Sequence, residues 1–518
     1  MDLISQLPES IVHRILSTFK ADDAPPVELV RMSVLSKTWF HLTSSFPVLD
    51  FNIENFVTKE SFFKYVEYTT SRFCQHNVTA KKLTFIANFK EPVELDIINR
   101  CVELLLKNGV HELVIDVVYV SYSARVTPRP KYRLPNVLLS VSVLKSLTIQ
   151  GCELPSSLMV DGVQFKSLIQ LALEYIVIDE EVITYLTTSC PLLQDFQVKG
   201  CHGFKRFCVY GHQNLEKVKI LQNTQVERID IDAPNLSTLL VKVWEGKGTP
   251  QMNLASCKKL RIVTYIGDVL PNSNGSTDFL TNFPFVETLL LDTTSNNLKL
   301  SSHSLKTLEL LSTCNLEDIE FRTPNLCYLH SREYYLLFQP MMEPSCVSSS
   351  THLKASMHCY PGGYIEAWFQ KLRRFLDKKN GLQVLNLYIN TTGGQKFREL
   401  EKLKAIELPP YELEYVELQL DIHESSSAHI AFVDAALLCC RPRSLTLKSS
   451  SPLTDIEEQS DIVKFTYEKL LEQEDEGRTK IQIVPSSSCK AQKLFRRVLP
   501  PEGKAICFIK EERTHFIS

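Results

Sequence analysis

Hydrophobic residues near the N-terminus follow a helical spacing. Ile11, Ile15, Leu16 and Phe19 stand at positions i, i+4, i+5 and i+8, which places them along one stripe of a helix. Pro8 comes just before this stripe, where a proline costs a helix no hydrogen bond. The pattern predicts a short amphipathic helix at the start of the chain.

A second helical stripe follows after a short break. Leu35, Trp39 and Leu42 stand at i, i+4 and i+7, and we expect one helix to carry all three. Two helices this short cannot bury all of their apolar surface against each other. The N-terminal segment therefore predicts a module that docks onto a partner.

From residue 110 onward a different pattern recurs. An apolar residue is followed three positions later by a leucine-like residue and five positions later by another apolar residue. Between residues 144 and 329 the copies are separated by roughly 19–26 residues, close to the period of about 20–29 residues that is typical of leucine-rich repeats. The central residues of the copies are Leu113, Leu147, Leu171, Phe196, Val218, Leu239, Val263, Leu289, Leu308, Leu329, Leu385, Val416 and Leu445.

A single coil of such a repeat cannot bury its own apolar face, so several coils must stack and the two ends need covers. The expected fold class is α/β, a horseshoe-shaped leucine-rich-repeat solenoid that follows the N-terminal helices and ends in a cap of helices and strands. A large α/β domain with leucine-rich strands is the simpler alternative, but ordinary βαβ units do not repeat one leucine offset so often. A β-propeller is disfavoured because the pattern shows no four-stranded blades.

The repeat pattern is interrupted after Leu329. Residues 344–351 have the composition of a loop. An amphipathic helix is expected after this loop, with Phe369 and Leu372 on its apolar face and Arg373 on its solvent face. The repeats then resume and fade near the C-terminus.

Composition and charge narrow the function classes. A chain of 518 residues is too long for one compact core, and its 44% hydrophobic content is ordinary for a folded protein. A formal charge of −3 leaves no basic surplus to neutralise phosphates, so nucleic-acid binding is not expected. No apolar stretch is long enough to span a membrane, and the N-terminus lacks a secretory signal. The 15 cysteines stand mostly singly on apolar runs, so we expect reduced thiols and a location in the nucleus or cytoplasm.

The sequence carries no recognisable catalytic or cofactor motif. It has no nucleophile elbow, phosphate-binding loop or dinucleotide fingerprint. It also has no C-x-x-C or H-E-x-x-H pair to bind zinc. We therefore expect no enzyme activity from its own residues, no cofactor and no metal site.

The N-terminal residues resemble the F-box of plant F-box proteins that carry leucine-rich repeats. The resemblance rests on Leu7, Pro8, Ile11, Ile15, Leu16, Val34, Leu35, Lys37 and Trp39. Residues 45–52 resemble the segment that follows the F-box in those proteins. Two features depart from the family pattern: Thr38 stands where arginine is usual, and Pro25-Pro26 lengthens and stiffens the break between the helices.

This resemblance implies a substrate-recognition subunit of a Skp–cullin–F-box ubiquitin ligase. The nine residues that carry it match the family positions that dock into the Skp-family adaptor, and through that adaptor the chain would reach a cullin. The repeats would hold a target protein for ubiquitination and proteasomal degradation. The bond-forming cysteine would belong to another protein, so the chain would act by proximity.

The resemblance and the repeat pattern together predict six segments. They are an F-box at 1–52, a connecting and N-terminal capping segment at 53–109, leucine-rich repeats at 110–330, an insertion with a loop and an amphipathic helix at 331–381, further repeats at 382–450 and a C-terminal cap at 451–518. Two other functions stay open. One is a repeat scaffold whose F-box does not bind the adaptor, and the other is a receptor subunit that needs a small molecule to hold its target.

Overall fold

The computed structural model divides the chain into two compact units, Met1–Gly267 and Asp268–Ser518. The residues that it describes are 7–16, 26–88, 92–117, 132–160, 162, 165–222, 226–243, 249–269, 279–293, 298–311, 319–332, 353–359, 365–378, 381–391, 409–422, 426–449, 456–473, 479–485 and 505–512. Phe19, Pro25 and the loop expected at 344–351 lie outside these ranges.

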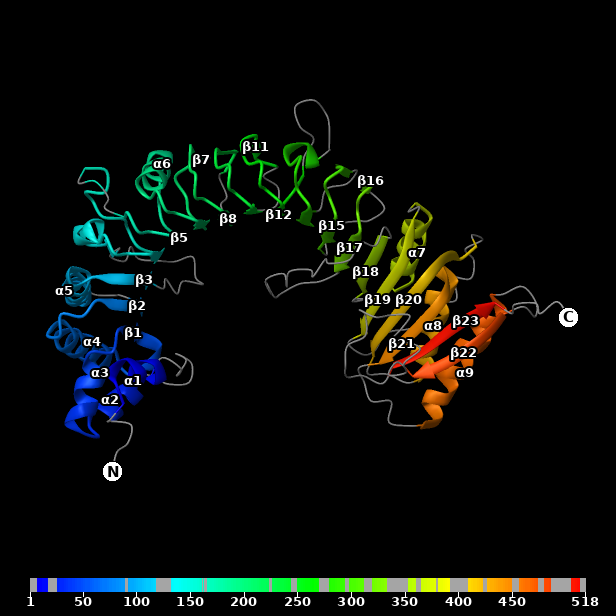
Figure 1. Ribbon diagram of the computed structural model, residues 1–518, viewed down its shortest axis with the longest axis horizontal. Coiled ribbons are helices and arrows are strands. Elements are labelled where there is room, and N and C mark those ends of the chain that lie inside the picture. The colour runs from blue at the N-terminus through cyan, green and yellow to red at the C-terminus, as the bar shows by residue number, and fades with distance from the viewer. Residues whose placement is uncertain are drawn as a thin grey trace. The chain divides into compact units, whose positions relative to one another are not determined.

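Three short helices open the first unit (Figure 1): α1 (Glu9–Leu16), α2 (Pro26–Ser33) and α3 (Lys37–Ser44). The single helix expected to carry Leu35, Trp39 and Leu42 is therefore divided. Ser36 is extended, and its Oγ accepts a hydrogen bond from the backbone N–H of Trp39 at 3.2 Å. A serine in this position caps a new helix, so Val34 and Leu35 lie in the turn between α2 and α3.

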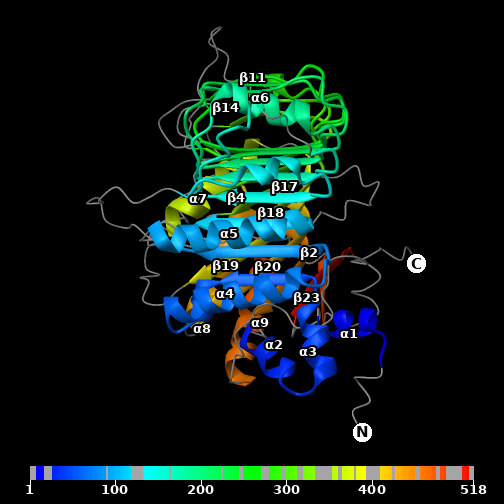
Figure 2. The same ribbon diagram turned by 90° about the vertical axis from the view of Figure 1, so that its left-hand side faces the viewer.

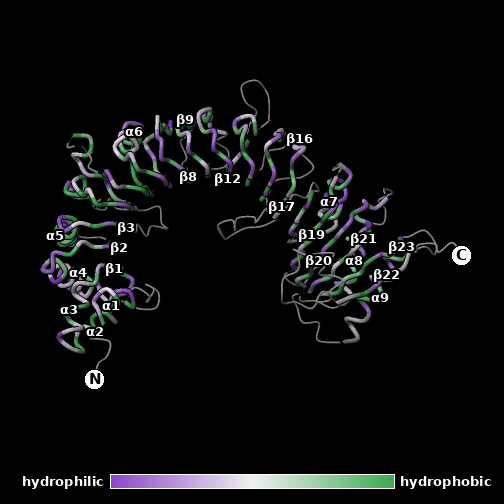
Figure 3. Tube along the Cα trace, viewed as in Figure 1, coloured by the Kyte–Doolittle hydropathy of each residue, from purple (hydrophilic) through white to green (hydrophobic). Residues whose placement is uncertain are grey.

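A ladder of parallel strands forms the body of the first unit. In spatial order its strands are β1 (Val48–Asn52), β2 (Ala80–Ala87), β3 (Val110–Val117), β4 (Ser146–Gln150), β5 (Gln170–Glu174), β6 (Asp195–Lys199), β8 (Lys217–Leu221), β10 (Thr238–Lys242) and β12 (Ile262–Ile266). Buried and partly exposed positions alternate along these strands, as the hydropathy of the trace also shows (Figure 3).

The register of this ladder explains the leucine spacing. Leu83, Leu113, Leu147, Leu171 and Phe196 occupy equivalent positions on successive strands. All five side chains are buried. Each therefore packs against its counterparts on the neighbouring coils, and the column forms a continuous core.

The chain returns between the strands through helices and short strands. The returning elements are η2 (Ile53–Asn55), α4 (Lys59–Cys74), α5 (Pro92–Asn108), η3 (Asn136–Ser140), α6 (Glu180–Ser189), β7 (Arg206–Val209), β9 (Arg228–Ile231) and β11 (Gln251–Asn253). Figure 2 shows α4 and α5 lying along the same side of the ladder, and β7, β9 and β11 form a small parallel sheet. The ladder begins at β1, so two strands precede residue 110, where the first repeat was expected. The segment predicted to connect and cap contributes β2 to the ladder.

The second unit has a parallel ladder of its own. Its strands are β13 (Thr288–Asp292), β15 (Thr307–Leu310), β17 (Tyr328–Arg332), β18 (Leu353–Cys359), β19 (Leu382–Thr391), β20 (Tyr411–Ile422) and β21 (Cys440–Ser449). The other elements are η4 (Phe279–Asn282), β14 (Leu298–Ser301), β16 (Ile319–Arg322), α7 (Ile365–Lys378), α8 (Ser426–Cys439) and α9 (Ile456–Glu472). At its end the direction reverses: β23 (Ala505–Glu512) pairs antiparallel with β21, and β22 (Thr479–Pro485) pairs antiparallel with β23.

The predicted insertion at 331–381 contains a strand that the sequence pattern did not indicate. β18 pairs in parallel with both β17 and β19, which makes it a full member of the ladder. Ala355 and Met357 take the buried positions that larger aliphatic residues fill elsewhere. An alanine at the central position hides the repeat from a search based on leucine.

The helix expected after this strand is confirmed as α7. Phe369 and Leu372 are buried on its apolar face, as predicted. Arg373 is not on the solvent face, because it is buried, forms an ion pair with Asp377 and donates a hydrogen bond to the Pro409 carbonyl oxygen. With both ladders in place, the predicted α/β repeat fold is confirmed.

Eleven cysteines whose side chains the structure describes are free thiols, and nine of these are buried. Burial raises the pKa of Cys190 and of Cys439 to about 12 and that of Cys201 to about 11. These thiols stay protonated at neutral pH and pack like small apolar side chains. Within the described part of the chain, no helix combines the length and the apolar character needed to cross a bilayer.

Candidate functional site on the N-terminal helices

The three N-terminal helices share a small apolar core. Val12 and Leu16 of α1 pack with Trp39 and Leu42 of α3 and with Phe46, and all five side chains are buried. Val12 and Leu16 are four residues apart, so they lie on one stripe of α1. This stripe is the one by which α1 attaches to its own chain.

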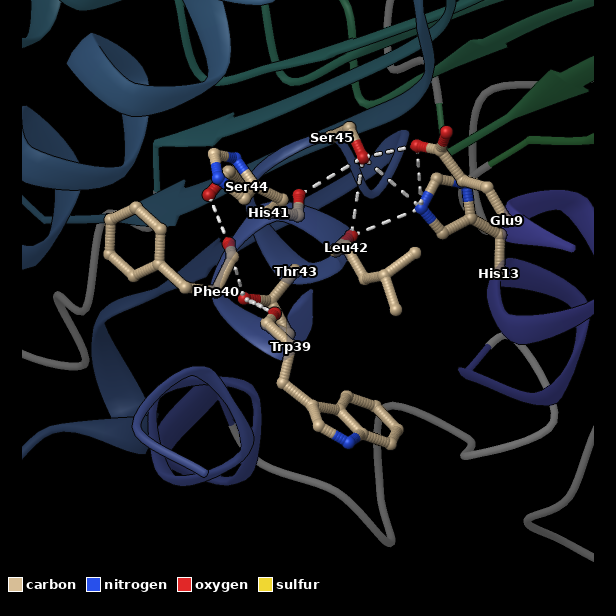
Figure 4. Close-up of polar contacts among 9 residues, drawn as sticks. All are labelled: Glu9, His13, Trp39, Phe40, His41, Leu42, Thr43, Ser44 and Ser45. Atoms are coloured by element: carbon tan, nitrogen blue, oxygen red, sulfur yellow. Dashed lines mark hydrogen bonds and ion pairs between the residues drawn. The ribbon is translucent and has the colours of Figure 1, made fainter. Parts of the chain in front are cut away.

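A polar network fixes α1 against the end of α3 (Figure 4). The His13 ring places Nε2 3.0 Å from the Leu42 carbonyl oxygen, which accepts a hydrogen bond from the ring N–H. Ser45 Oγ donates to the Glu9 carboxylate, and the edge of the His13 ring meets Phe46 at a centroid distance of 5.5 Å. Long-range polar contacts of this kind hold the two helices at a defined angle.

An arginine of α4 contacts this helical module and helps to join it to the strand ladder of the same unit. The Arg72 guanidinium of α4 lies over the Phe40 ring at 4.0 Å from the centroid and donates a hydrogen bond to the Phe40 carbonyl oxygen at 2.9 Å. It also donates to Ser44 Oγ. A stacked and hydrogen-bonded arginine restrains both direction and distance, so α3 is anchored on α4.

Five of the nine predicted docking residues are apolar and exposed. On α1 and the residues before it, Leu7, Ile11 and Ile15 are 39%, 42% and 38% exposed. They follow one another at intervals of four and form a stripe beside the buried one. In the turn between α2 and α3, Val34 is 79% and Leu35 is 68% exposed. The structure thus gathers these residues as two apolar sets on the helical module.

The other four predicted residues fall into two groups. Pro8 and Lys37 are exposed next to the apolar sets. Leu16 and Trp39 are 4% and 8% exposed and belong to the internal core. In Figure 4 the Trp39 indole points away from the polar network. These two side chains support the exposed residues from within the module.

One further exposed residue was missed in the sequence. Val30 is 40% exposed and precedes Val34 by four residues, so it extends the second apolar set along α2. The four-residue spacing between Val30 and Val34 in the sequence could have identified it. Exposed aliphatic residues that form a contiguous patch are typical of interaction surfaces.

The chemistry that this site offers is apolar contact. Its exposed members carry no nucleophile, and in the described ranges no three His, Cys, Asp or Glu side chains gather closely enough to hold a metal ion. The arrangement can bind another apolar surface, and the basic Lys37 at the start of α3 can meet an acidic group. The site therefore fits protein–protein recognition.

Two family models match the chain. The F-box domain model matches residues 4–51, and the model described as "FBD-associated F-box protein At5g56370, LRR repeats" matches residues 98–277. The first covers the three-helix module and β1. The second begins within α5 and covers the ladder of the first unit from β3 onward.

Curated relatives from Arabidopsis thaliana are similar over about half of this chain. "Putative F-box protein At3g58860" is 25% identical over 51% of this chain and 56% of its own length. "Putative F-box/FBD/LRR-repeat protein At4g03220" is 25% identical over 47% of both, and "Putative F-box/LRR-repeat protein At5g02930" is 26% identical over 46% of this chain and 45% of its own length. The alignments thus span about half the length of each relative. A match with the crystal structure of the TLR13-ssRNA13 complex has a TM-score of 0.24 at 10% identity, over 69% of this chain and 55% of that one, and it carries no argument here.

Proposed function

We propose that this chain, an F-box protein with leucine-rich repeats like the relatives that it matches, is the substrate-recognition subunit of a Skp–cullin–F-box ubiquitin ligase. In this proposal the helical module docks onto the Skp-family adaptor. The repeats hold a protein target for ubiquitination and proteasomal degradation in the nucleus or cytoplasm. The observation that carries the proposal is the pair of exposed apolar sets on helices that already have a closed core of their own.

Folding of the chain alone leaves the apolar side chains of the two exposed sets only partly buried. Complete burial of an isoleucine or leucine side chain contributes about 1.5–3 kcal/mol. Leu7, Ile11 and Ile15 keep roughly two-fifths of their exposure, and Val34 and Leu35 keep most of it. An adaptor that covers both sets therefore gains the part of this contribution that folding leaves unused. Leu16 and Trp39 keep the module rigid, so little ordering is required on binding.

The chain would contribute geometry to the reaction. The adaptor links the helical module to a cullin that carries the ubiquitin-loaded enzyme, and the repeats keep a target lysine near that enzyme. Holding two reactants together replaces a bimolecular encounter with an effectively unimolecular one. Matches to F-box and repeat models fit this non-catalytic role. Arg72 would matter here because it fixes how the docked module meets the repeats of its own unit.

A binding measurement with two matched double variants tests the proposal. Ile11→Asp with Ile15→Asp places two carboxylates on the apolar stripe of α1. We expect retention of the full-length chain by purified Skp-family adaptor to fall by at least about a hundredfold, because two central apolar contacts are lost and two charges are desolvated. Met159→Asp with Val160→Asp changes two exposed residues elsewhere in the first unit and should leave retention unchanged.

The outcomes separate an adaptor-binding ligase subunit from a repeat scaffold that does not bind the adaptor. If the α1 variant binds as tightly as the natural chain, the exposed stripe is not the docking surface. If the natural chain itself does not bind the adaptor, the chain is a repeat scaffold and the ligase assignment fails. Circular dichroism of both variants checks that the helices remain folded.

A further inference from the structure

Three neighbouring strands of the first unit present an unusual surface. β8, β10 and β12 bury one side of the ladder and leave the alternate residues partly exposed on the other side. Across this second side, three rows run from strand to strand. The rows are Lys217, Thr238, Ile262; Lys219, Leu240, Thr264; and Leu221, Lys242, Ile266. We call these nine residues the lysine–aliphatic face.

The composition of the lysine–aliphatic face is biased in two ways. Lysine is its only charged residue type, and four of its other members are leucine or isoleucine. Asp195 on β6 borders this face: its Oδ2 lies 3.7 Å from Lys219 Nζ, and it is the register partner of Lys217. Within the described residues, no carboxylate forms an ion pair with Lys217. The face therefore combines an excess of positive charge with exposed aliphatic surface.

The neighbouring strands on the other side of β6 have the opposite character. Glu174 on β5 accepts hydrogen bonds from Lys199 Nζ at 2.9 Å and from Gln197 Nε2 at 2.7 Å. Asp116 on β3 has a raised pKa because it is partly buried and lies near Glu174. On this part of the ladder the Glu174 carboxylate is thus paired within the chain. The positive excess begins at β8.

A strained aromatic residue borders the lysine–aliphatic face. Tyr175 follows β5 with φ of 51°, in the left-handed region that side chains other than glycine rarely adopt. Its hydroxyl donates a hydrogen bond at 3.0 Å to the side-chain oxygen of Gln222, the residue that follows Leu221 and also has a positive φ of 54°. Strained residues cluster at binding sites because the surrounding structure holds them for a purpose. Tyr175 is 47% exposed, so its ring forms a wall beside the end of β8.

We infer that the lysine–aliphatic face binds an extended segment of the target protein that carries two carboxylates at alternate positions and an aliphatic residue at the next alternate position. Lys217, Lys219 and Leu221 are alternate residues of one strand, so they recur every 6.6–6.8 Å, about the same repeat as the side chains on one side of an extended peptide. Carboxylates of the segment meet the lysines, and its aliphatic residue packs on Leu221. The inference rests on the proposed function only in taking this segment from a protein that is to be ubiquitinated.

Selection from a phage-displayed library of random dodecapeptides tests the inference, with the immobilised full-length chain as bait. We expect enriched peptides to carry two Asp or Glu residues at alternate positions and a Leu, Ile or Val two positions away. Lys217→Glu with Lys219→Glu should reduce retention of these peptides by at least about tenfold, because like charges then face each other. Binding of the natural chain should also weaken as salt is raised.

A charge-swap experiment and a matched control make the result decisive. The doubly reversed chain, used as bait in its own selection, should enrich peptides with Lys or Arg at the same positions. Lys258→Glu with Lys259→Glu, an exposed pair outside the face, should leave the acidic preference intact. Enrichment without an acidic bias, or a preference unaffected by the reversal, would overturn the inference. Adaptor retention is measured on the same preparation, so loss of adaptor binding with an intact acidic preference would refute the ligase role instead.

Discussion

The N-terminal helices and the strand ladder of the first unit use Leu, Ile and Val in opposite ways. In the ladder, residues such as Leu113, Leu147 and Leu171 are almost completely buried, each between equivalent residues of its neighbours. In the helical module, Val12 is buried while Ile11, one residue earlier, is 42% exposed. The ladder completes its core within the chain, and the module leaves part of its apolar surface open.

This difference shows how to distinguish a stabilising residue from a binding residue when both are apolar. A side chain that lies in a repeated buried column contributes to stability and has no surface left for a partner. A side chain on a second stripe, next to a stripe that already closes the core, contributes little to folding and remains free to bind. Substitutions in the two regions should therefore separate stability from binding.

The largest effect is expected in the ladder core. Phe196 is fully buried and its ring centroid lies 5.6 Å from that of Phe207. Phe196→Ala removes this contact and leaves a cavity, which should cost about 3–5 kcal/mol in the free energy of unfolding. Urea denaturation followed by circular dichroism measures the change, and Leu192→Ala, at a 47% exposed site, should shift it by less than about 0.5 kcal/mol. Equal effects of the two variants would break the comparison.

A core substitution in the helical module should behave differently. Leu16→Ala opens the small core beneath the docking stripe and should cost about 2–4 kcal/mol of local stability. Because a bound partner stabilises the folded form, excess adaptor should restore much of the thermal stability of this variant. The adaptor should not restore that of Phe196→Ala. Differential scanning calorimetry with and without adaptor distinguishes the two, and rescue of both variants would contradict the separation.

Helix caps provide a smaller and more local comparison. Ser36 caps α3, and Asp179 caps α6 by accepting a hydrogen bond from the backbone N–H of Val182 at 2.8 Å. Replacing either cap with alanine should cost about 1 kcal/mol. Only Ser36→Ala should also weaken adaptor binding, because Ser36 ends the turn that positions the exposed Leu35. Calorimetric titration with the adaptor measures this, and a loss of affinity in Asp179→Ala would count against it.

The smallest effect concerns pH. Hydrogen bonding from Arg228, together with the nearby Arg206, holds the pKa of Asp230 below its usual value of 3.8. The ionised form is thus favoured by folding, so its stabilising contribution is present at neutral pH and is lost as pH falls below about 4 through the folded-state pKa. Asp230→Asn should melt a few degrees lower at pH 7, and the difference should shrink on acidification. A gap between Asp230→Asn and the natural chain that stays constant across this pH range would exclude this linkage.

Most of the fold could be predicted from the sequence because its repeat is a local pattern. The spacing of Leu289, Leu308 and Leu329 is enough to predict their strands, and the structure places the three residues in register. β18 escaped because Ala355 fills the central position, and its membership is decided by pairing with β17 and β19. The resemblance to plant F-box proteins with leucine-rich repeats, carried by a handful of N-terminal residues, is confirmed by the family matches.

The candidate site was harder to predict in detail. Helical periodicity identifies an apolar stripe, but it does not say which side of the stripe the chain itself will cover. Leu16 and Trp39 were expected at the docking surface and lie in the internal core, whereas Val30 was overlooked and is exposed. Ser36 caps a new helix, so Leu35 lies in a turn while Trp39 lies on α3. The helical spacing of Leu35 and Trp39 gives no sign of this break.

The reversal of strand direction after β21 also covers an edge of the sheet in the second unit. β21 runs from Cys440 to Ser449, and without β23 its free peptide groups would form a template onto which a second molecule could add a strand. Among the strands that the structure describes, β22 then lies at this edge of the sheet. A chain truncated before residue 479 would keep its repeats but expose this template, and we expect it to polymerise where the intact chain stays dispersed.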